Sequence, residues 1–268
     1  MPHKIVLAGV GKVYGEDVVA IDRLSMEVPS NEIVCLLGPS GCGKSTVLNL
    51  IAGFEFPTAG TVALDGEVVK WPGPDRGVVF QEHALFPWLT VVENIGFGSK
   101  LRRGQGDPAH YRESVHRYID WMGLKGFERS YPKMLSGGMR QRAALARVLV
   151  NEPKVLLMDE PFAALDAQTR LSMQMLLLNV WERLRTTILF ITHDIDEAVF
   201  LGDRIYVMTA RPGRIKEVIP VPLDRPRTYD MVLCGAFNQT KAHIFDLIRE
   251  ESSPLWSASP AAKSSTPG

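Results

Sequence analysis

A glycine-rich stretch near residue 40 has the composition and spacing of a phosphate-binding loop. It reads Gly38-Pro39-Ser40-Gly41-Cys42-Gly43-Lys44-Ser45 and matches the pattern G-x-x-x-x-G-K-[ST] in full. Glycines let the backbone curl so that its N–H groups face phosphate oxygens, and a following helix adds the positive end of its dipole. Lys44 would reach the β- and γ-phosphates of a nucleotide, and the Ser45 hydroxyl would bind Mg²⁺. We expect the loop and the next residue, Thr46, to contact the nucleotide, whereas the alternative is a turn without a ligand.

Two adjacent acids follow an apolar run later in the chain. Asp159 and Glu160 come directly after the run from Val155 to Met158. A carboxylate at the end of a strand can face a phosphate loop on a neighbouring strand, so Asp159 would hold Mg²⁺ through water. Glu160 would polarise the attacking water. Acids are also common at solvated strand ends, so this pair indicates a catalytic site only when it is considered together with the glycine-rich stretch.

The hydrophobic pattern indicates which elements position these groups. Short, nearly continuous apolar runs predict strands buried on both faces at 32–37, 155–158 and 187–192. Helices are expected at 45–52, 110–122, 138–150 and 166–185, and a hairpin around Asp65-Gly66 at 61–69. Buried strands that alternate with helices predict a mostly parallel sheet covered by helices.

Charge and length limit the class of protein. The 268 residues carry 30 Lys and Arg and 30 Asp and Glu, so the chain lacks the basic excess typical of nucleic-acid binders. The charge is uneven, because residues 100–147 hold eleven basic and four acidic residues, a net of +7, which we interpret as a helical insert. No apolar run has the ~18 residues of a membrane span, and 5–10 is too short for a signal peptide, so we expect a cytoplasmic chain.

Further segments resemble the ATP-binding cassettes of ABC transporters, over about residues 4–215. They are the signature-like Leu135-Ser136-Gly137-Gly138-Met139-Arg140-Gln141-Arg142, Gln81 of a Q-loop, Asp166 of a D-loop, the switch-like His193, and Tyr14, where the family keeps an aromatic that stacks on adenine. The resemblance implies an α/β fold: a P-loop (RecA-like) core with a mostly parallel sheet, an N-terminal antiparallel β subdomain and a helical insert at about 82–150. The cassette would span 1–237, and 238–268 would form a C-terminal helix and a flexible tail.

The resemblance also implies a site for ATP and Mg²⁺ that is completed by a second copy of the chain. Catalysis would rest on Glu160, His193, Gln81 and Lys44, and the metal on Ser45, Gln81 and Asp159. Nucleotide contacts would come from Tyr14, from the loop and, across the dimer, from Ser136, Gly137, Gly138 and Asp166. Each single residue has an alternative: Tyr14 an ordinary strand aromatic, Gln81 a loop amide, and His193 a core histidine.

The implied partners are membrane permease subunits, together with a solute-binding protein, and no nucleic acid. The segment Phe86 to Ile95 would dock on the permease at the cytoplasmic face of the inner membrane, although its apolar residues could instead be core packing. The motifs at 86–90, 159–162 and 211–215 resemble importers of nitrate, sulfonate, taurine or bicarbonate, despite departures at 133–134 and 163–164. The alternatives are an ABC ATPase that acts on nucleic acid and a regulatory module that binds ATP without hydrolysing it.

Overall fold

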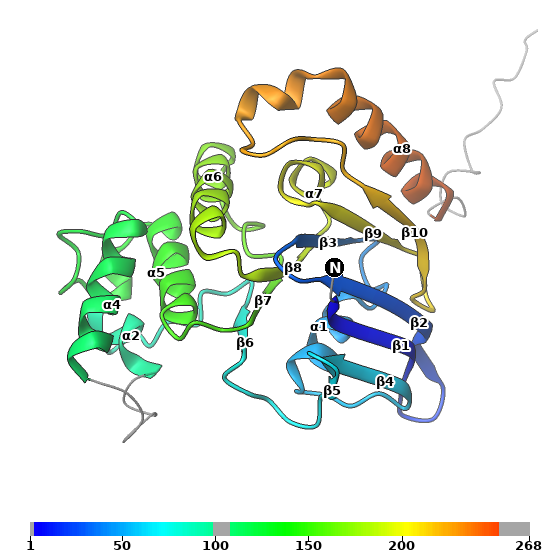
Figure 1. Ribbon diagram of the computed structural model, residues 1–268, viewed down its shortest axis with the longest axis horizontal. Coiled ribbons are helices and arrows are strands. Elements are labelled where there is room, and N and C mark those ends of the chain that lie inside the picture. The colour runs from blue at the N-terminus through cyan, green and yellow to red at the C-terminus, as the bar shows by residue number, and fades with distance from the viewer. Residues whose placement is uncertain (1–2, 99–107, 252–268) are drawn as a thin grey trace, which may run out of the picture.

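The part of the chain that the structure describes contains two β-sheets. The computed structural model describes residues 3–98 and 108–251, and Figure 1 shows the arrangement of its elements. The first sheet is antiparallel, with the order β2-β1-β4-β5, and its strands are β1 (His3–Tyr14), β2 (Val18–Pro29), β4 (Ala59–Leu64) and β5 (Glu67–Val68). The β4–β5 hairpin turns at Asp65 and Gly66, whose φ angles of 50° and 81° suit a tight two-residue turn. This sheet is the predicted antiparallel subdomain.

The second sheet has six strands in the order β10-β9-β3-β8-β7-β6. Its strands are β3 (Ile33–Leu37), β6 (Arg76–Val79), β7 (Val155–Asp159), β8 (Thr187–Thr192), β9 (Arg204–Met208) and β10 (Ile215–Pro220). All neighbours pair in parallel except β10 and β9. Every residue of β3 and β8 is buried, which confirms the predicted double-sided strands. The carboxyl ends of β3, β6, β7 and β8 therefore meet at one edge of the sheet.

Helices cover both faces of the parallel sheet. Helix α1 (Lys44–Ala52) packs in a core that it shares with the antiparallel sheet and with alternate residues of β3, Val34 and Leu36. The other residues of β3, including Cys35 and Leu37, face a second core under α6 (Ala167–Leu184), α7 (Ile195–Leu201) and α8 (Gly235–Glu251). Strand β3 thus contributes to two hydrophobic cores at once.

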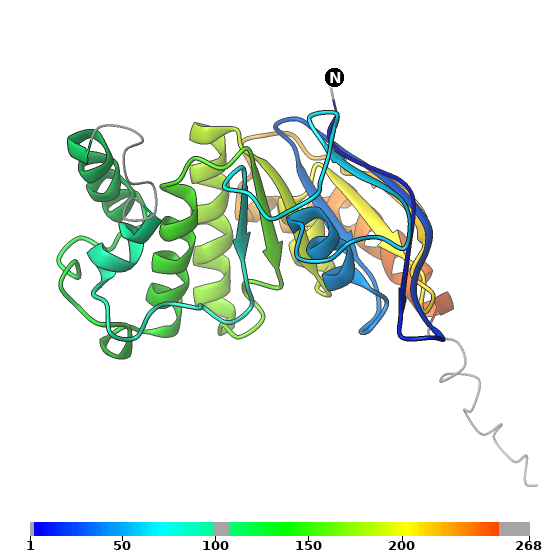
Figure 2. The same cartoon turned by 90° about the horizontal axis from the view of Figure 1, so that it is seen from below.

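The helical insert lies at one end of the molecule and the antiparallel sheet at the other (Figures 1 and 2). The insert contains α2 (Val91–Ile95), α4 (Pro108–Trp121), the 3₁₀ turn Pro132–Met134 and α5 (Gly137–Leu149). A capping box begins α2, because the Thr90 side chain accepts from the Glu93 N–H while Glu93 accepts from the Thr90 N–H. The insert predicted from the sequence is therefore present.

The C-terminal helix starts slightly earlier than expected. Helix α8 begins at Gly235 and buries Phe237 and Ile244 in the core beneath it. A boundary at residue 237 stays a prediction, and the predicted flexible tail falls on residues 252–268, outside the described part of the chain. Among the described residues, no helix combines the length and the apolar composition that crossing a membrane requires.

Candidate functional site

The glycine-rich stretch forms a tight loop between β3 and α1. Gly41 and Gly43 have φ angles of 74° and 102°, which L side chains rarely adopt. A Cβ atom at Gly43 would lie 2.6 Å from Cδ1 of Ile21, and one at Gly38 would lie 2.9 Å from Sγ of Cys42. The fixed glycines of the motif are therefore required by the loop geometry itself, which leaves the curled backbone accessible to a ligand.

Lys44 places its ammonium inside this loop. Its Nζ donates to the carbonyl oxygens of Gly38 at 2.8 Å and Pro39 at 3.0 Å, and the residue is 7% exposed. Cys42 is 1% exposed, and burial raises the pKa of its thiol despite the nearby ammonium. The structure therefore favours the interpretation of Cys42 as a small residue that fits the loop. It argues against a redox-sensitive thiol, which would need a pKa lowered by local positive charge.

A cavity of about 300 Å³ opens over the loop. It is lined by Tyr14, Val18, Ala20, Ser40, Gly41, Gly43, Lys44, Ser45, Thr46, Glu160 and Arg211. The sequence analysis missed Val18, Ala20 and Arg211. Arg211 donates from Nε to the carbonyl oxygen of Gly41 at 2.8 Å. Its only signal in the sequence is its place in the segment 211–215, which resembles the importers and does not by itself indicate a contact with the loop.

Tyr14 forms part of the cavity wall at the end of β1. Its hydroxyl donates to Oε2 of Glu55 at 2.5 Å and lies 3.4 Å from Oγ1 of Thr46 on α1. The residue is 37% exposed, and the Lys12 ammonium lies 5.0 Å from the centroid of its ring. The side chain is therefore held at the cavity mouth, where a flat ligand could stack on it.

The acidic pair lies at the carboxyl end of β7, beside the loop. Burial raises the pKa of Asp159, and the neighbouring Glu160 acts in the same direction, while a hydrogen bond with the Ser45 side chain lowers it. Asp159 and Ser45 thus bring oxygen atoms together, the ligand type that Mg²⁺ prefers. Glu160 has a φ of 43°, and its N–H donates to the carbonyl oxygen of Ile191 at 3.0 Å.

His193 follows β8 and faces Glu160 on the adjacent strand end. Its Nδ1 lies 2.9 Å from Oε2 of Glu160, and its side chain is 59% exposed, which rules out a buried core histidine. Gln81 is exposed and follows β6, where Val79 pairs with Met158. Gln81 therefore lies near the same edge of the sheet, although it does not line the cavity.

The signature-like segment lies at a second, separate place. Ser136 caps α5, its Oγ accepting from the Met139 N–H at 3.3 Å, and Asp166 caps α6, accepting from the Thr169 N–H at 2.9 Å. The hydrogen bonds from Thr169 lower the pKa of Asp166. A cavity of about 250 Å³ is lined by Ser136, Gly138, Met139, Arg142, Gln168, Thr169 and Ser172. It shares no residue with the cavity over the glycine-rich loop.

The apolar segment from Phe86 to Ile95 divides into two parts. Val91 and Ile95 are buried in the core of the insert, whereas Trp88 is 70% exposed. The Phe86 ring lies 4.5 Å from that of Phe97, centroid to centroid. Core packing thus accounts for Val91 and Ile95, whereas docking on a permease stays a prediction for the exposed part, which is centred on Trp88.

Comparison with known proteins adds independent information. A family profile described as "ABC transporter" matches residues 21–163. The chain is 47% identical to the nitrate import ATP-binding protein NrtD of Synechocystis over 87% of this chain and 89% of that protein. It is 45% identical to the aliphatic sulfonates import ATP-binding protein SsuB of Bacillus cereus, over 82% and 87%.

A solved structure also matches the fold. It is a dimeric ATP-binding cassette in a post-hydrolysis state, bound to ADP and Pi, with a TM-score of 0.70 and 32% identity. The match covers 82% of this chain and all of that one. The phosphate-binding loop, the acidic strand end and the separate signature segment thus occur in a chain whose relatives are described as ATP-binding proteins. The chain belongs to the ABC transporter family, as an ATP-binding protein that hydrolyses ATP.

Proposed function

We propose that the chain powers a membrane importer of a small anionic solute such as nitrate or a sulfonate, and that it works as a pair of identical copies. The observation that carries the proposal is the separation of the two cavities. One holds Lys44 and Glu160, and the other holds Ser136, with no residue in common. A twofold pair that apposes the first cavity of one copy to the second cavity of its partner forms two complete sites.

The residues around the first cavity suit a nucleotide and Mg²⁺. The loop backbone and Lys44 bind the phosphates, and the Tyr14 ring supports the adenine. Ser45 and Asp159, which already share a hydrogen bond, hold the metal together with Gln81 at the same sheet edge. Bound Mg²⁺ would neutralise the charge that develops on the phosphates.

The remaining groups act on the water and on the γ-phosphate. Glu160 takes a proton from the attacking water, since it lines the cavity and its carboxylate is held by Nδ1 of His193. His193 orients that carboxylate through Nδ1, and with both ring nitrogens protonated it also donates from Nε2 toward the γ-phosphate. From the partner copy, Ser136 and the N–H groups of Gly137 and Gly138 would enclose the same phosphate, with Asp166 beside them.

Two features support import rather than another use of ATP. Two relatives that match 87% and 82% of the chain are named as import proteins, one for nitrate and one for aliphatic sulfonates. The exposed part of the segment from Phe86 to Ile95, centred on Trp88, offers a contact for a permease subunit at the cytoplasmic face of the membrane. A solute-binding protein would then choose the solute.

A mixture of two variants tests the shared site. Lys44→Ala disables the first cavity and Ser136→Arg the second, so neither variant alone should hydrolyse ATP. In a mixed dimer, the Ser136→Arg copy keeps its own Lys44 and meets the intact Ser136 of its partner, which restores one site. An equimolar mixture should therefore recover about a quarter of wild-type phosphate release, because half the dimers are mixed and each has one site of two.

The matched control combines Lys44→Ala with Glu160→Gln. Both changes affect the first cavity, so no pairing of the two copies yields an intact site. Recovery equal to this control would contradict the shared site. Import itself is tested by reconstituting the chain with its permease in liposomes and measuring ATP-dependent uptake of nitrate, sulfonate and, as a neutral control, a sugar.

A further inference from the structure

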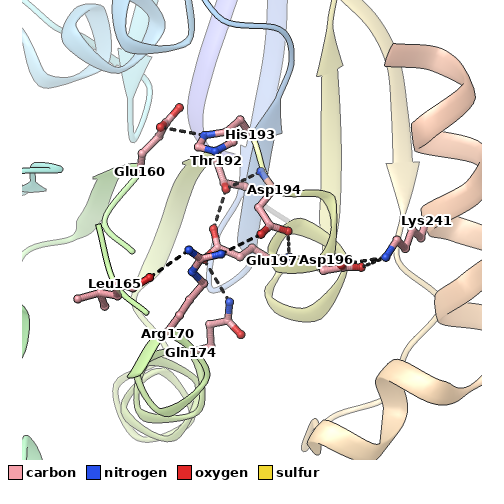
Figure 3. Close-up of polar contacts among 10 residues, drawn as sticks. All are labelled: Glu160, Leu165, Arg170, Gln174, Thr192, His193, Asp194, Asp196, Glu197 and Lys241. Carbon is pink, nitrogen blue, oxygen red and sulfur yellow. Dashed lines mark hydrogen bonds and ion pairs between the residues drawn. The ribbon is translucent and has the colours of Figure 1, made fainter. Parts of the chain in front are cut away.

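Arg170 on α6 lies between two loops that belong to different halves of the ATP site (Figure 3). Its Nη1 donates to Oδ2 of Asp194 at 3.3 Å, and its Nη2 donates to the carbonyl oxygen of Leu165 at 3.1 Å. Its Nε is buried and has no hydrogen-bond partner among the described residues. One planar guanidinium thus joins the loop that carries His193 to the loop that carries Asp166.

On one side, Arg170 belongs to a network that fixes the backbone around His193. The Asp194 N–H donates to Oγ1 of Thr192 at 3.0 Å, and Thr192 donates to Oε2 of Glu197 at 2.7 Å. Gln174 donates to Oε1 of the same Glu197 at 3.2 Å. Arg170 and Gln174 are four residues apart and lie on one face of α6, so this helix holds both flanks of His193 (Figure 3).

On the other side, the loop that Arg170 contacts borders the second cavity. Leu165 immediately precedes Asp166, the N-cap of α6. A Cβ atom at Gly138 would lie 2.5 Å from Cγ2 of Thr169, so the first turn of α6 is in close contact with the start of α5. A displacement of the Leu165 carbonyl therefore changes the position of groups that line the cavity containing Ser136.

We propose that Arg170 is a positioning residue that couples the two half-sites within one chain. It holds His193 beside Glu160 and, through Leu165, holds the signature segment that serves the nucleotide of the partner copy. Rearrangement at one half-site is thereby transmitted to the other through a single side chain that contacts neither nucleotide. The inference rests on the proposed function, because it requires that the two cavities of one chain serve different ATP molecules.

The geometry also predicts how substitutions act. Gln at this position is too short to bridge both acceptors, and Lys carries one donor group that can reach Asp194 or Leu165 but cannot fork between them. Arg170→Gln should therefore lower the kcat of ATP hydrolysis at least about tenfold, with the KM for ATP within about twofold, since the phosphate loop is untouched. Arg170→Lys should recover only part of the loss.

Mixed dimers separate coupling from a local effect. In the dimer of Lys44→Ala and Ser136→Arg copies, the working site takes His193 from the Ser136→Arg copy and Ser136 from the other. Arg170→Gln is added to one copy at a time, with Arg183→Gln on the same helix as the charge-matched control. Coupling predicts that Arg170→Gln lowers kcat from either copy, while Arg183→Gln changes it from neither.

Four results would overturn the inference. Loss of kcat only when Arg170→Gln is in the copy that supplies His193 would reduce the residue to local positioning. Unchanged kcat in both arrangements, or a fall in kcat that simply follows a lower melting temperature, would remove the role altogether. Failure of the mixed dimer without Arg170→Gln to hydrolyse ATP would instead refute the shared site, and this inference with it.

Discussion

His193 and Glu160 are hydrogen-bonded across the ends of two adjacent parallel strands, with Nδ1 and Oε2 2.9 Å apart. The contact depends on the backbone at Glu160, where a φ of 43° turns the chain as it leaves β7. It places an exposed imidazole next to the carboxylate that lines the cavity over the phosphate loop.

Glu160→Gln should abolish ATP hydrolysis while ATP binding persists. The amide keeps the size of the side chain but has no charge with which to take a proton from water, so we expect a loss of at least about 100-fold in kcat. ATP should then accumulate in a closed dimer, measurable by size-exclusion chromatography with ATP and with ADP. Asp120→Asn on the surface of α4 is the control. Normal phosphate release by the Gln variant would show that Glu160 is not the base.

Arg211→Gln should weaken nucleotide binding. Arg211 lines the cavity, and only its Nε is used in the contact with Gly41, which leaves its terminal nitrogens for an anionic ligand. Loss of one charge-assisted hydrogen bond corresponds to about a tenfold higher Kd for ATP and ADP in calorimetric titrations. Arg214→Gln in the same loop, where the guanidinium pairs with Asp22, is the control. Equal weakening by both changes would mean a general effect of charge or of loop structure.

The three cysteines should differ sharply in reactivity. Cys35 and Cys42 are buried, and burial raises the pKa of both thiols, whereas Cys234 is partly exposed. Ellman's reagent should therefore modify one thiol in the folded protein and three after unfolding. Cys234→Ser should leave none that reacts while the chain is folded. Mass-spectrometric detection of rapid labelling at Cys42 would contradict the buried position of that side chain.

Glu197→Gln should become more stabilising relative to wild type as the pH rises. Burial raises the pKa of Glu197 above its ordinary value of 4.5, and Asp194 adds to this, while hydrogen bonds from Thr192 and Gln174 oppose it. The folded chain thus holds this proton more tightly than the unfolded chain, so its stabilising contribution is lost as pH rises from about 4.5 through the raised value. Calorimetric melting temperatures between about pH 4.5 and pH 8 measure the difference, with Glu113→Gln as the exposed control. A constant difference across this range would refute it.

The sequence predicted the phosphate loop well because its requirements are local. Gly41 and Gly43 are needed for backbone angles, and Lys44 and Ser45 follow at a fixed distance along the same chain. Arg211 was not predicted as a site residue, since it meets Gly41 from 170 positions away and its neighbours reveal nothing of that contact. Such a pairing depends on how β9 is placed beside β3, which short-range patterns do not encode.

Tertiary contacts also determine which residues of the segment from Phe86 to Ile95 are buried and which are exposed. Its apolar residues look alike in the sequence, but Val91 and Ile95 are buried in the core that the insert shares with the parallel sheet, while Trp88 remains exposed. Asn94 contributes to this division, because its buried amide donates to the carbonyl oxygens of Phe86 and Leu89 and so fixes the turn that leads into α2. In the sequence, Asn94 is a polar residue within a largely apolar run. Hydrophobic periodicity alone would predict a surface position for it.

Strand β3 is buried on both faces, because its successive side chains enter two different cores. Because the strand is packed on both faces, the end of β3 from which the phosphate loop begins is held firmly. We therefore expect nucleotide binding to shift this loop little. The insert lies at the other end of the molecule and packs into only one of these two cores, the one that lies under α6, α7 and α8 (Figure 1). The phosphate loop is thus supported by two cores and the insert by one, so we expect a rearrangement driven by the nucleotide to displace the insert more than the loop.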